Sequence, residues 1–327
     1  DNRWGKFFSA SAGWTFSNEE FFKDLIDPSI MSFGKLRASW GQNGNVNVLG
    51  NYSYTSGIAT NSQWYQYGAS NLPTYGSMPN GIANPKLTWE TSEQIDFGAD
   101  FRFLNDRLSV GLDYYIKTTK DLLVPAPAMP ESGVSSITIN AGEIKNSGFE
   151  MEMSWKDNIG DFNYGISANL ATLSNEVTYL DPSVPRIQGG GVDGSSPETI
   201  FCYFEQNQPV WYMRGFKYAG RDAEGAALYY TKDGQTTNDP QADDMTNIGS
   251  GIPSLTYGIT LNAEYKGFDL SIFGAGAAGN DVYYGLYRTG YNNIAEGIYD
   301  DFKSGKLPEA KSVAGSGTFW RSSAMVY

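Results

Sequence analysis

The sequence contains no histidine and a single cysteine, Cys202, in 327 residues. Without histidine, this chain by itself cannot provide Ser-His or Cys-His catalysis or a His-ligated zinc site. One cysteine excludes a disulfide within the chain and a cysteine-based metal site. Basic residues are also scarce, because 23 Lys and Arg stand against 36 Asp and Glu, giving a net charge of −13. No basic stripe is available to neutralise phosphates, so we expect no nucleic-acid partner.

Long apolar runs are missing too. No stretch of about 18 apolar residues occurs, so the sequence predicts no transmembrane helix. The first residues, DNRWGKFF, lack the basic start and apolar core of a signal peptide. Glycine (38 residues) and aromatic residues (15%) are abundant, whereas charged residues make up only 18%. This composition suits many strands and turns, and it predicts an all-β protein rather than a helical or doubly wound enzyme.

Apolar and polar residues alternate in several stretches, as they do in strands with one apolar and one polar face. Short turns are expected at LNDR (104–107), KDNIGD (156–161) and Lys266-Gly267, each joining two such stretches into a hairpin. The eight predicted strands cover 8–16, 36–40, 87–103, 107–119, 143–155, 162–176, 253–265 and 268–280.

The connections between these strands are sorted by length. Those at 104–107, 156–161 and 266–267 are short, whereas 41–86, 120–142, 177–253 and 281–317 are long. Short turns on one side and long loops on the other are typical of outer-membrane barrels. The strands run 10–15 residues, which is enough to cross a bilayer at a tilt. Aromatic residues near strand ends, such as Trp40, Trp155 and Tyr265, suggest interface girdles.

Successive strands must cross the membrane in opposite directions, so segment 177–253 must contain an even number of membrane-crossing strands. We favour zero. WYMRGFKYAG (211–220) and AALYYT (226–231) are expected to form a small hairpin in an extracellular loop. Residues 17–32 would be an unusually long periplasmic connection, with a helical turn at 19–26.

Four stretches carry a family resemblance: KLRASWGQNGN (35–45), NPKLTWETSEQIDFGADFRFLNDRLSVGLDYYIKTTKDLL (84–123), NAGEIKNSGFEMEMSW (140–155) and YKGFDLSIFGAGAAGN (265–280). In combination they resemble the C-terminal barrel of SusC/RagA-type TonB-dependent outer-membrane transporters. The resemblance implies a 22-stranded antiparallel transmembrane β-barrel, an N-terminal plug and a SusD-like surface lipoprotein that closes over the barrel. It also implies import of oligosaccharides or peptides, driven by the TonB complex, across the outer membrane of a Gram-negative bacterium.

The chain contains only part of what that family pattern includes. It carries no recognisable plug, TonB box or signal sequence, and it offers about eight to nine strands. We therefore expect residues 1–327 to be the C-terminal portion of the barrel domain, without the plug and the final strands. An isolated arc would leave two open edges and could not sit stably in lipid.

The polar strand faces are expected to line the barrel lumen. The residues assigned to this lining are Arg37, Asp96, Asp100, Arg102, Asp113, Glu150, Glu152, Glu264 and Asp269. Glu150 and Glu152, two apart in a strand, could also be a glycosidase pair, since their separation of roughly 6.5–7 Å would fall between the retaining separation of about 5–5.5 Å and the wider inverting one. Nothing nearby supplies a cleft, so the sequence favours a polar lining, no catalytic residues and no enzyme.

Two loops carry further candidates. Trp64, Tyr65, Tyr67 and Tyr75 lie in loop 51–80, where aromatic rings could stack on a sugar or an apolar peptide group, or pack against the loop or the lid lipoprotein. KDGQTTNDPQADD (232–244) does not fit the EF-hand pattern, and a solvated loop is preferred, although oxygen-ligated calcium stays open. We expect no other cofactor. The alternative function is a soluble β-rich protein that binds or hydrolyses carbohydrate.

Overall fold

The structure is a computed structural model, and it describes residues 4–46, 55–66, 73–79, 81–134, 136–189, 202–223 and 227–283. The chain divides into two compact units. The first comprises Asp1–Pro185 and Ile259–Phe273, and the second comprises Arg186–Gly258 and Gly274–Tyr327.

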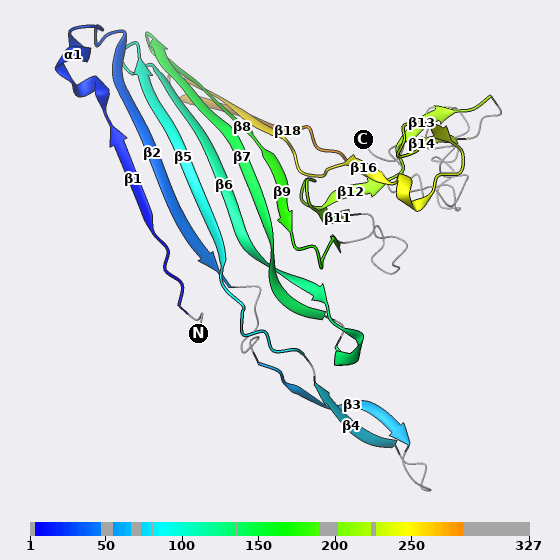
Figure 1. Ribbon diagram of the computed structural model, residues 1–327. Helices are drawn as coiled ribbons and strands as arrows, with labels where there is room; N and C mark the ends of the chain where they lie inside the picture. Colours follow the sequence, from blue (N-terminus) through cyan, green and yellow to red (C-terminus); the bar gives the residue numbers. More distant parts are fainter. Residues whose placement is uncertain are drawn as a thin grey trace. The chain divides into compact units, whose positions relative to one another are not determined.

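One large sheet dominates the fold (Figure 1). Its strand order is β1 (Ser9–Trp14), β2 (Met31–Asn45), β5 (Glu90–Phe103), β6 (Leu108–Pro127), β7 (Ser136–Ile159), β8 (Phe162–Thr172), β17 (Leu255–Tyr265) and β18 (Phe268–Ala278). Neighbours from β1 to β8 pair antiparallel. All eight predicted strands are therefore present, but β2, β6 and β7 are longer than predicted, and β6 and β7 extend well into the connection expected at 120–142. Because β8 is followed directly by β17 in the sheet, the expectation that 177–253 adds no crossing is confirmed as well.

The short turns form where the sequence predicts them, and local backbone chemistry explains their tightness. Leu104, Asn105 and Asp106 all have positive φ, between 57° and 64°. Lys266 and Gly267 do so as well, at 46° and 85°. Asparagine, aspartate and glycine tolerate this left-handed conformation better than other residues, which suits Asn105, Asp106 and Gly267, whereas Leu104 and Lys266 adopt it against their usual preference.

The turn predicted at 156–161 is too wide. β7 continues to Ile159, and Lys156, Asp157 and Asn158 pair in register with β8. Only Gly160 and Asp161 remain for the turn, and Gly160 has φ +60°. The prediction took the polar stretch KDNIGD for a turn. Near its end, however, a strand of this sheet carries polar residues on both faces, so polar composition does not mark the end of the strand.

At the end of the sheet with long connections, β6 and β7 run past their neighbours. β6 has 20 residues and β7 has 24. The register between them shifts near Asp121, which has φ +57°. β9 (Ser174–Leu180) takes over from β8 as the partner of β7. The most buried apolar side chains of the first unit gather mainly in this region: Leu123, Val124, Ala126, Ala141, Val177, Leu180 and Val184.

Side chains replace backbone partners at the base of these loops. Asn140 accepts a hydrogen bond from the Thr88 amide at 2.9 Å and donates to the Thr88 carbonyl at 3.0 Å. Its amide nitrogen also donates to the Asp121 carbonyl at 2.8 Å. Asn84 donates to the Thr138 carbonyl at 2.9 Å. These bonds tie the segment before β5 to the β6–β7 extension and supply partners for backbone groups that have left the regular ladder.

The loops contain more strands than the sequence predicts. β3 (Ile58–Gln66) pairs with β4 (Pro73–Pro79) in a ribbon that was not foreseen. In the second unit, β10 (Arg186–Gln188), β11 (Cys202–Glu205), β12 (Tyr212–Gly215) and β16 (Thr246–Gly249) form one sheet. β13 (Tyr218–Arg221), β14 (Ala227–Tyr230) and β15 (Thr236–Thr237) form another. The expected loop hairpin is thus correct for β13 and β14, whereas the WYMRG stretch belongs largely to β12.

The connection between β1 and β2 contains the expected helical turn. A 3-10 turn, η1 (Phe16–Asn18), is followed by α1 (Glu20–Lys23). Two further 3-10 turns are η2 (Pro130–Ser132) and η4 (Ala242–Asp244). Across the described ranges, no helix is long and apolar enough to cross a membrane.

Candidate functional site

The strand registers place seven of the nine predicted polar residues, those from Arg37 to Glu152, on one face of the sheet. Arg37 lies opposite Gly98, which lies opposite Asp113, which lies opposite Glu150. Residues directly opposite in an antiparallel ladder point to the same side. A parallel row runs through Lys35, Asp100, Gly111, Glu152 and Asn169. Asp96 and Arg102 lie on the same strand face as Asp100, at even spacing. We call this side the polar face.

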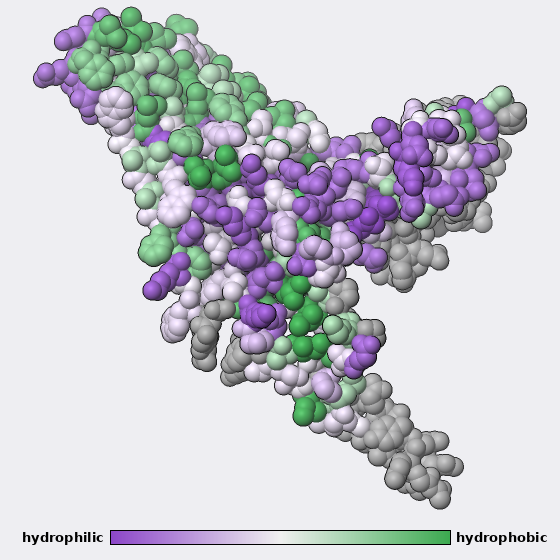
Figure 2. Space-filling view, viewed as in Figure 1, coloured by the Kyte–Doolittle hydropathy of each residue, from purple (hydrophilic) through white to green (hydrophobic). Residues whose placement is uncertain are grey.

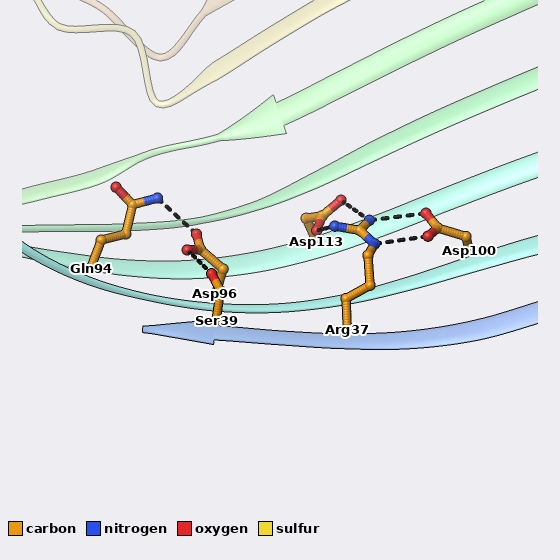
Figure 3. Close-up of polar contacts among 6 residues, drawn as sticks. All are labelled: Arg37, Ser39, Gln94, Asp96, Asp100 and Asp113. Carbon is orange, nitrogen blue, oxygen red and sulfur yellow. Dashed lines mark hydrogen bonds and ion pairs between the residues drawn. The ribbon is translucent and has the colours of Figure 1, made fainter. Parts of the chain in front are cut away.

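Three charged side chains of the polar face form a compact ion cluster (Figure 3). The Arg37 guanidinium donates to both carboxylate oxygens of Asp100, at 2.8 and 2.9 Å. It also contacts both carboxylate oxygens of Asp113, at 3.0 Å. Gly98, between them, makes room, because a Cβ there would lie 2.4 Å from an Asp113 oxygen and 2.7 Å from Arg37 Cζ. One arginine thus bridges three strands, β2, β5 and β6.

The other polar-face candidates differ in their partners. Asp96 accepts from the Ser39 hydroxyl at 2.9 Å and from the Gln94 side chain at 2.7 Å (Figure 3). The Arg102 guanidinium lies over the Phe33 ring at 5.1 Å. Glu150 and Glu152 are exposed, and neither makes an ion pair or side-chain hydrogen bond within the part of the chain that the structure describes. Glu264 and Asp269 line an open depression near the short turns, together with Lys156, Asn163 and Ser271.

Replacing Arg37 by alanine is expected to leave Asp100 and Asp113 facing each other without their shared cation. The three side chains are about one-third exposed, so solvent screens the effect, and we expect a loss of about 1–2 kcal/mol of unfolding free energy. Urea titration of the full-length protein, read by its gel mobility without boiling, measures this. Lys35→Ala removes the same charge from the same strand face and should change little. Adding Asp113→Asn to the Arg37→Ala variant should recover part of the lost unfolding free energy. Equal urea midpoints for Arg37→Ala and Lys35→Ala would contradict a stabilising role of the ion cluster.

The opposite side of the sheet is apolar and lies open. Leu36, Ala99, Leu112, Met151 and Leu170 form one row across it. Phe97, which sits in the next row, is 58% exposed. Further exposed side chains on this face include Ile95, Tyr114, Phe149, Met153, Ile166, Ile259 and Leu261. Soluble proteins rarely expose a continuous apolar surface of this extent. We call this side the apolar face.

Charged pairs mark both ends of the apolar face. Toward the long loops, Lys120 contacts Glu93 at 3.1 Å, and the Trp40 indole donates to the same carboxylate at 2.9 Å. Toward the short turns, Arg107 contacts Asp157 at 3.2 Å. Between these limits, the residues of β5 on this face are Ile95, Phe97, Ala99, Phe101 and Phe103.

The loop aromatics are only partly described. Trp64 lies opposite Tyr75, and Tyr65 lies opposite Thr74, in the β3–β4 ribbon. The register therefore brings Trp64 and Tyr75 to adjacent backbone positions, which the sequence did not predict. Tyr67 lies outside the described residues.

The second unit contains a polar cluster that the sequence reasoning missed. Arg186 donates to both carboxylate oxygens of Glu205, at 2.8 and 3.1 Å, and the Tyr212 hydroxyl donates to the same carboxylate. Burial tends to raise the pKa of Glu205, but hydrogen bonds from Arg186 and Tyr212 outweigh it and hold that pKa below its ordinary value. Arg186 stands 19 residues before Glu205 and Tyr212 stands seven after it, and the pairing of β10, β11 and β12 brings the three side chains together.

This cluster predicts a pH dependence confined to the β10–β12 sheet. Because the folded pKa of Glu205 is lowered, its contribution is present above the ordinary value of about 4.5 and is lost as pH falls through the folded value. Amide hydrogen exchange of β11 and β12, corrected for intrinsic exchange, should therefore accelerate below pH 4.5. Glu205→Gln should be less protected at neutral pH and lack the acid transition. A wild-type profile that is flat down to pH 3 would contradict this prediction.

In the acidic loop 232–244, the Asp244 carboxylate accepts hydrogen bonds from backbone amides of the same loop. Asp244 accepts from the Lys232 amide at 2.9 Å and from the Gln241 amide at 2.8 Å. These backbone hydrogen bonds lower the pKa of Asp244. Among the residues whose positions are described, no group of three or more acidic, histidine or cysteine side chains is arranged to hold a metal ion.

The profile of the family described as "TonB dependent receptor-like, beta-barrel" matches residues 1–223. The chain belongs to this family. The TonB-dependent receptor SusC of Bacteroides thetaiotaomicron is 28% identical over 311 residues, which cover 92% of this chain and 30% of SusC. TonB-dependent receptor P39 of Formosa agariphila is 28% identical over 322 residues, covering 86% of this chain and 30% of P39.

Solved structures agree with these relatives. The RagAB peptide transporter superposes with a TM-score of 0.70 at 28% identity, covering 85% of this chain and 29% of the matched chain. The RagAB peptide importer in its "open-open" state gives the same values. The expected SusC/RagA-type resemblance and the outer-membrane location of this family are confirmed. The chain spans about 30% of the length of the curated relatives it matches.

Proposed function

We propose that the chain forms part of the wall of a TonB-driven importer that takes up oligosaccharides or peptides through the outer membrane. The observation that carries this proposal is the similarity to SusC over 92% of the chain, joined by the structural match to the RagAB peptide transporter. In this proposal residues 1–327 are the C-terminal part of a barrel of about 22 strands, and the plug and remaining strands come from the rest of a longer protein.

The two faces of the sheet fit this role if the apolar face meets lipid and the polar face meets the lumen. The apolar stretch of β5 from Ile95 to Phe103 spans roughly 30 Å along the strand at about 3.3 Å per residue. At a tilt of about 40° it covers roughly 23 Å, close to the apolar band of about 25 Å in such barrels. The lumen lining would then be Arg37, Asp96, Asp100, Arg102, Asp113, Glu150, Glu152, Glu264 and Asp269.

The lumen lining proposed here is acidic. The ion cluster neutralises Arg37 with two carboxylates, and Glu150 and Glu152 add unneutralised negative charge beside it. Such a wall disfavours anionic cargo near it. In this proposal the polar side chains provide a hydrated passage and a surface for the plug, and no bond of the cargo is broken.

The partners proposed for the assembled importer are a SusD-like surface lipoprotein on the loop side and the TonB complex on the periplasmic side. The β3–β4 ribbon lies at the loop end of the sheet, opposite α1 (Figure 1). Trp64, Tyr65, Tyr67 and Tyr75 would there contact cargo or the lipoprotein. A calcium ion in loop 232–244 is disfavoured, because backbone amides already occupy both Asp244 oxygens.

The alternative, a soluble carbohydrate-binding or carbohydrate-hydrolysing protein, does not account for the open apolar face. A soluble β-protein covers such a face with a second layer. If the full-length protein fractionated with soluble proteins in the absence of detergent, the alternative would replace the importer.

Growth of a strain lacking the full-length gene tests the importer. We expect loss of growth on one cargo class, either a defined oligosaccharide or a defined peptide mixture, with normal growth on monosaccharides or free amino acids. Complementation should require an intact TonB system. A Trp64→Ala/Tyr75→Ala variant that still reaches the outer membrane should require more cargo for the same growth rate. Unchanged growth of the deletion strain on every member of both classes would contradict the proposal.

A further inference from the structure

The connection between β1 and β2 folds back over the apolar face. Phe16 lies on Gly34, since a Cβ at Gly34 would meet the Phe16 ring at 2.3 Å. Gly34 is opposite Phe101 in the ladder, which places both on the apolar face. The Phe16 ring contacts the Phe101 ring at 6.4 Å between centroids. The first turn of the connection is therefore seated on the side of the sheet proposed to face lipid.

The residue spacing of α1 and of the turn after it directs its side chains to three different sides. Phe22 points inward, because it is 9% exposed and packs edge-on against Phe16 at 5.0 Å. Phe21 and Leu25, four residues apart, project together and are 61% and 77% exposed. Glu20 and Asp24, also four apart, form a separate polar side. The segment is amphipathic on a scale of one to two turns.

The exposed apolar side chains continue a surface that already exists. Trp14, at the end of β1, is opposite Leu36 and so lies on the apolar face. Its ring is 6.5 Å from that of Phe21, and its indole nitrogen donates to Glu19 at 3.0 Å. Figure 2 shows hydrophobic residues covering the end of the sheet that bears α1, with hydrophilic residues at the tip. Trp14 thus joins an apolar surface to a polar edge, as tryptophans do at membrane interfaces.

We propose that residues 14–30 form an interfacial anchor, which seats Phe21 and Leu25 in the inner-leaflet boundary between the headgroups and acyl chains of the outer membrane. This inference rests on the proposed orientation of the apolar face toward lipid. The anchor lies at the short-turn end of the sheet, and that end faces the periplasm in the importer (Figure 1). Amphipathic helices at membrane interfaces bury their apolar side chains about 5–10 Å deep, and a similar depth would seat the two side chains here.

The charge of the segment identifies the kind of lipid. Glu19, Glu20, Asp24 and Asp27 stand against Lys23 alone, so the polar side is acidic. Anionic headgroups would repel it, whereas zwitterionic phospholipids would not. The partner surface is therefore a zwitterionic phospholipid leaflet, in contrast to the anionic surfaces that basic amphipathic helices recognise.

Spin labels on single cysteines test the anchor in the full-length protein. The labelled variants are Phe21→Cys, Leu25→Cys, Asp24→Cys and Phe97→Cys in a Cys202→Ser background, in phosphatidylcholine nanodiscs. Collision with oxygen, which partitions into lipid, is compared with collision with a water-soluble nickel chelate. Migration of the unboiled protein on a gel verifies that each variant is folded.

We expect a several-fold higher oxygen-to-nickel ratio at Phe21→Cys and Leu25→Cys than at Asp24→Cys. Adding phosphatidylglycerol should lower the ratio at Phe21→Cys. The Phe97→Cys label reports separately on the orientation of the sheet, because it lies in the middle of the apolar face. A lipid-exposed Phe97→Cys label with Phe21→Cys no different from Asp24→Cys would overturn the anchor alone. A water-exposed Phe97→Cys label would overturn the proposed orientation.

Discussion

Gly148→Ala is expected to cost about 3 kcal/mol of unfolding free energy, or to prevent the barrel from folding. A Cβ at Gly148 would lie 2.0 Å from the Thr172 carbonyl oxygen and 2.8 Å from the Tyr115 hydroxyl. Thr172 cannot move aside easily. Its hydroxyl accepts from the Phe149 amide at 2.9 Å and donates to the Phe149 carbonyl at 3.2 Å, so it is fixed to the same strand as the glycine.

The matched control for Gly148→Ala is Gly111→Ala. Gly111 lies on the neighbouring strand β6 and on the same polar face, but the nearest atoms to an added Cβ are 3.9 and 4.0 Å away. Alanine there should be neutral or stabilise by about 0.4–1 kcal/mol, because it restricts the unfolded chain. Urea midpoints of the unboiled band compare the two variants. Equal urea midpoints for Gly148→Ala and Gly111→Ala would show that the close contact of Gly148 with Thr172 does not determine the stability.

Glu90→Ala is the second substitution with a large expected effect. Glu90 is only 7% exposed, and its carboxylate accepts from the Leu123 amide at 2.9 Å and from the Asn45 side chain at 2.9 Å. Removing the carboxylate deprives the buried Leu123 amide of this acceptor, which costs about 1–3 kcal/mol. We expect a loss of about 2–3 kcal/mol, concentrated where β6 continues past its bulge.

Hydrogen exchange measured by mass spectrometry locates the effect of Glu90→Ala. Peptides covering Leu122–Ala126 should exchange faster, while those of β8 stay unchanged. Glu93→Ala is the control, because Glu93 lies three residues away and bonds the Lys120 and Trp40 side chains rather than a buried backbone amide, so it should cost less, about 1 kcal/mol. Glu90→Gln keeps an oxygen acceptor and should restore part of the protection. Faster exchange in Glu93→Ala than in Glu90→Ala would contradict this account.

The strand count and the strand faces could be predicted from the sequence because they depend on a period of two. Asp96 and Asp100 share a face for that reason alone, and the register between β5 and β6 adds Asp113 to it. Their pairing with Arg37 could not be foreseen. It depends on which residues stand opposite, and on Gly98 leaving space in the middle of the cluster.

The loop structure escaped prediction for other reasons. β6 continues through Asp121, in a left-handed conformation, and through Pro125 and Pro127. Such residues usually end a strand, and here an asparagine side chain and a buried glutamate supply the missing backbone partners. The strands from β10 to β16 have two to four residues each, too short for alternation to be read.

The adjacency of β8 and β17 has a consequence for the order of assembly. β8 ends at Thr172 and β17 begins at Leu255, so 82 residues intervene, against four between β5 and β6. Closing the longer connection costs about 2.7 kcal/mol more in chain entropy, if the intervening chain is unstructured. The sheets from β10 to β16 are built from strands near one another in sequence, so they can form early and shorten the effective connection. The edge of β8 would then stay unpaired until the inserted loop has folded, so that loop determines when β17 can join the sheet.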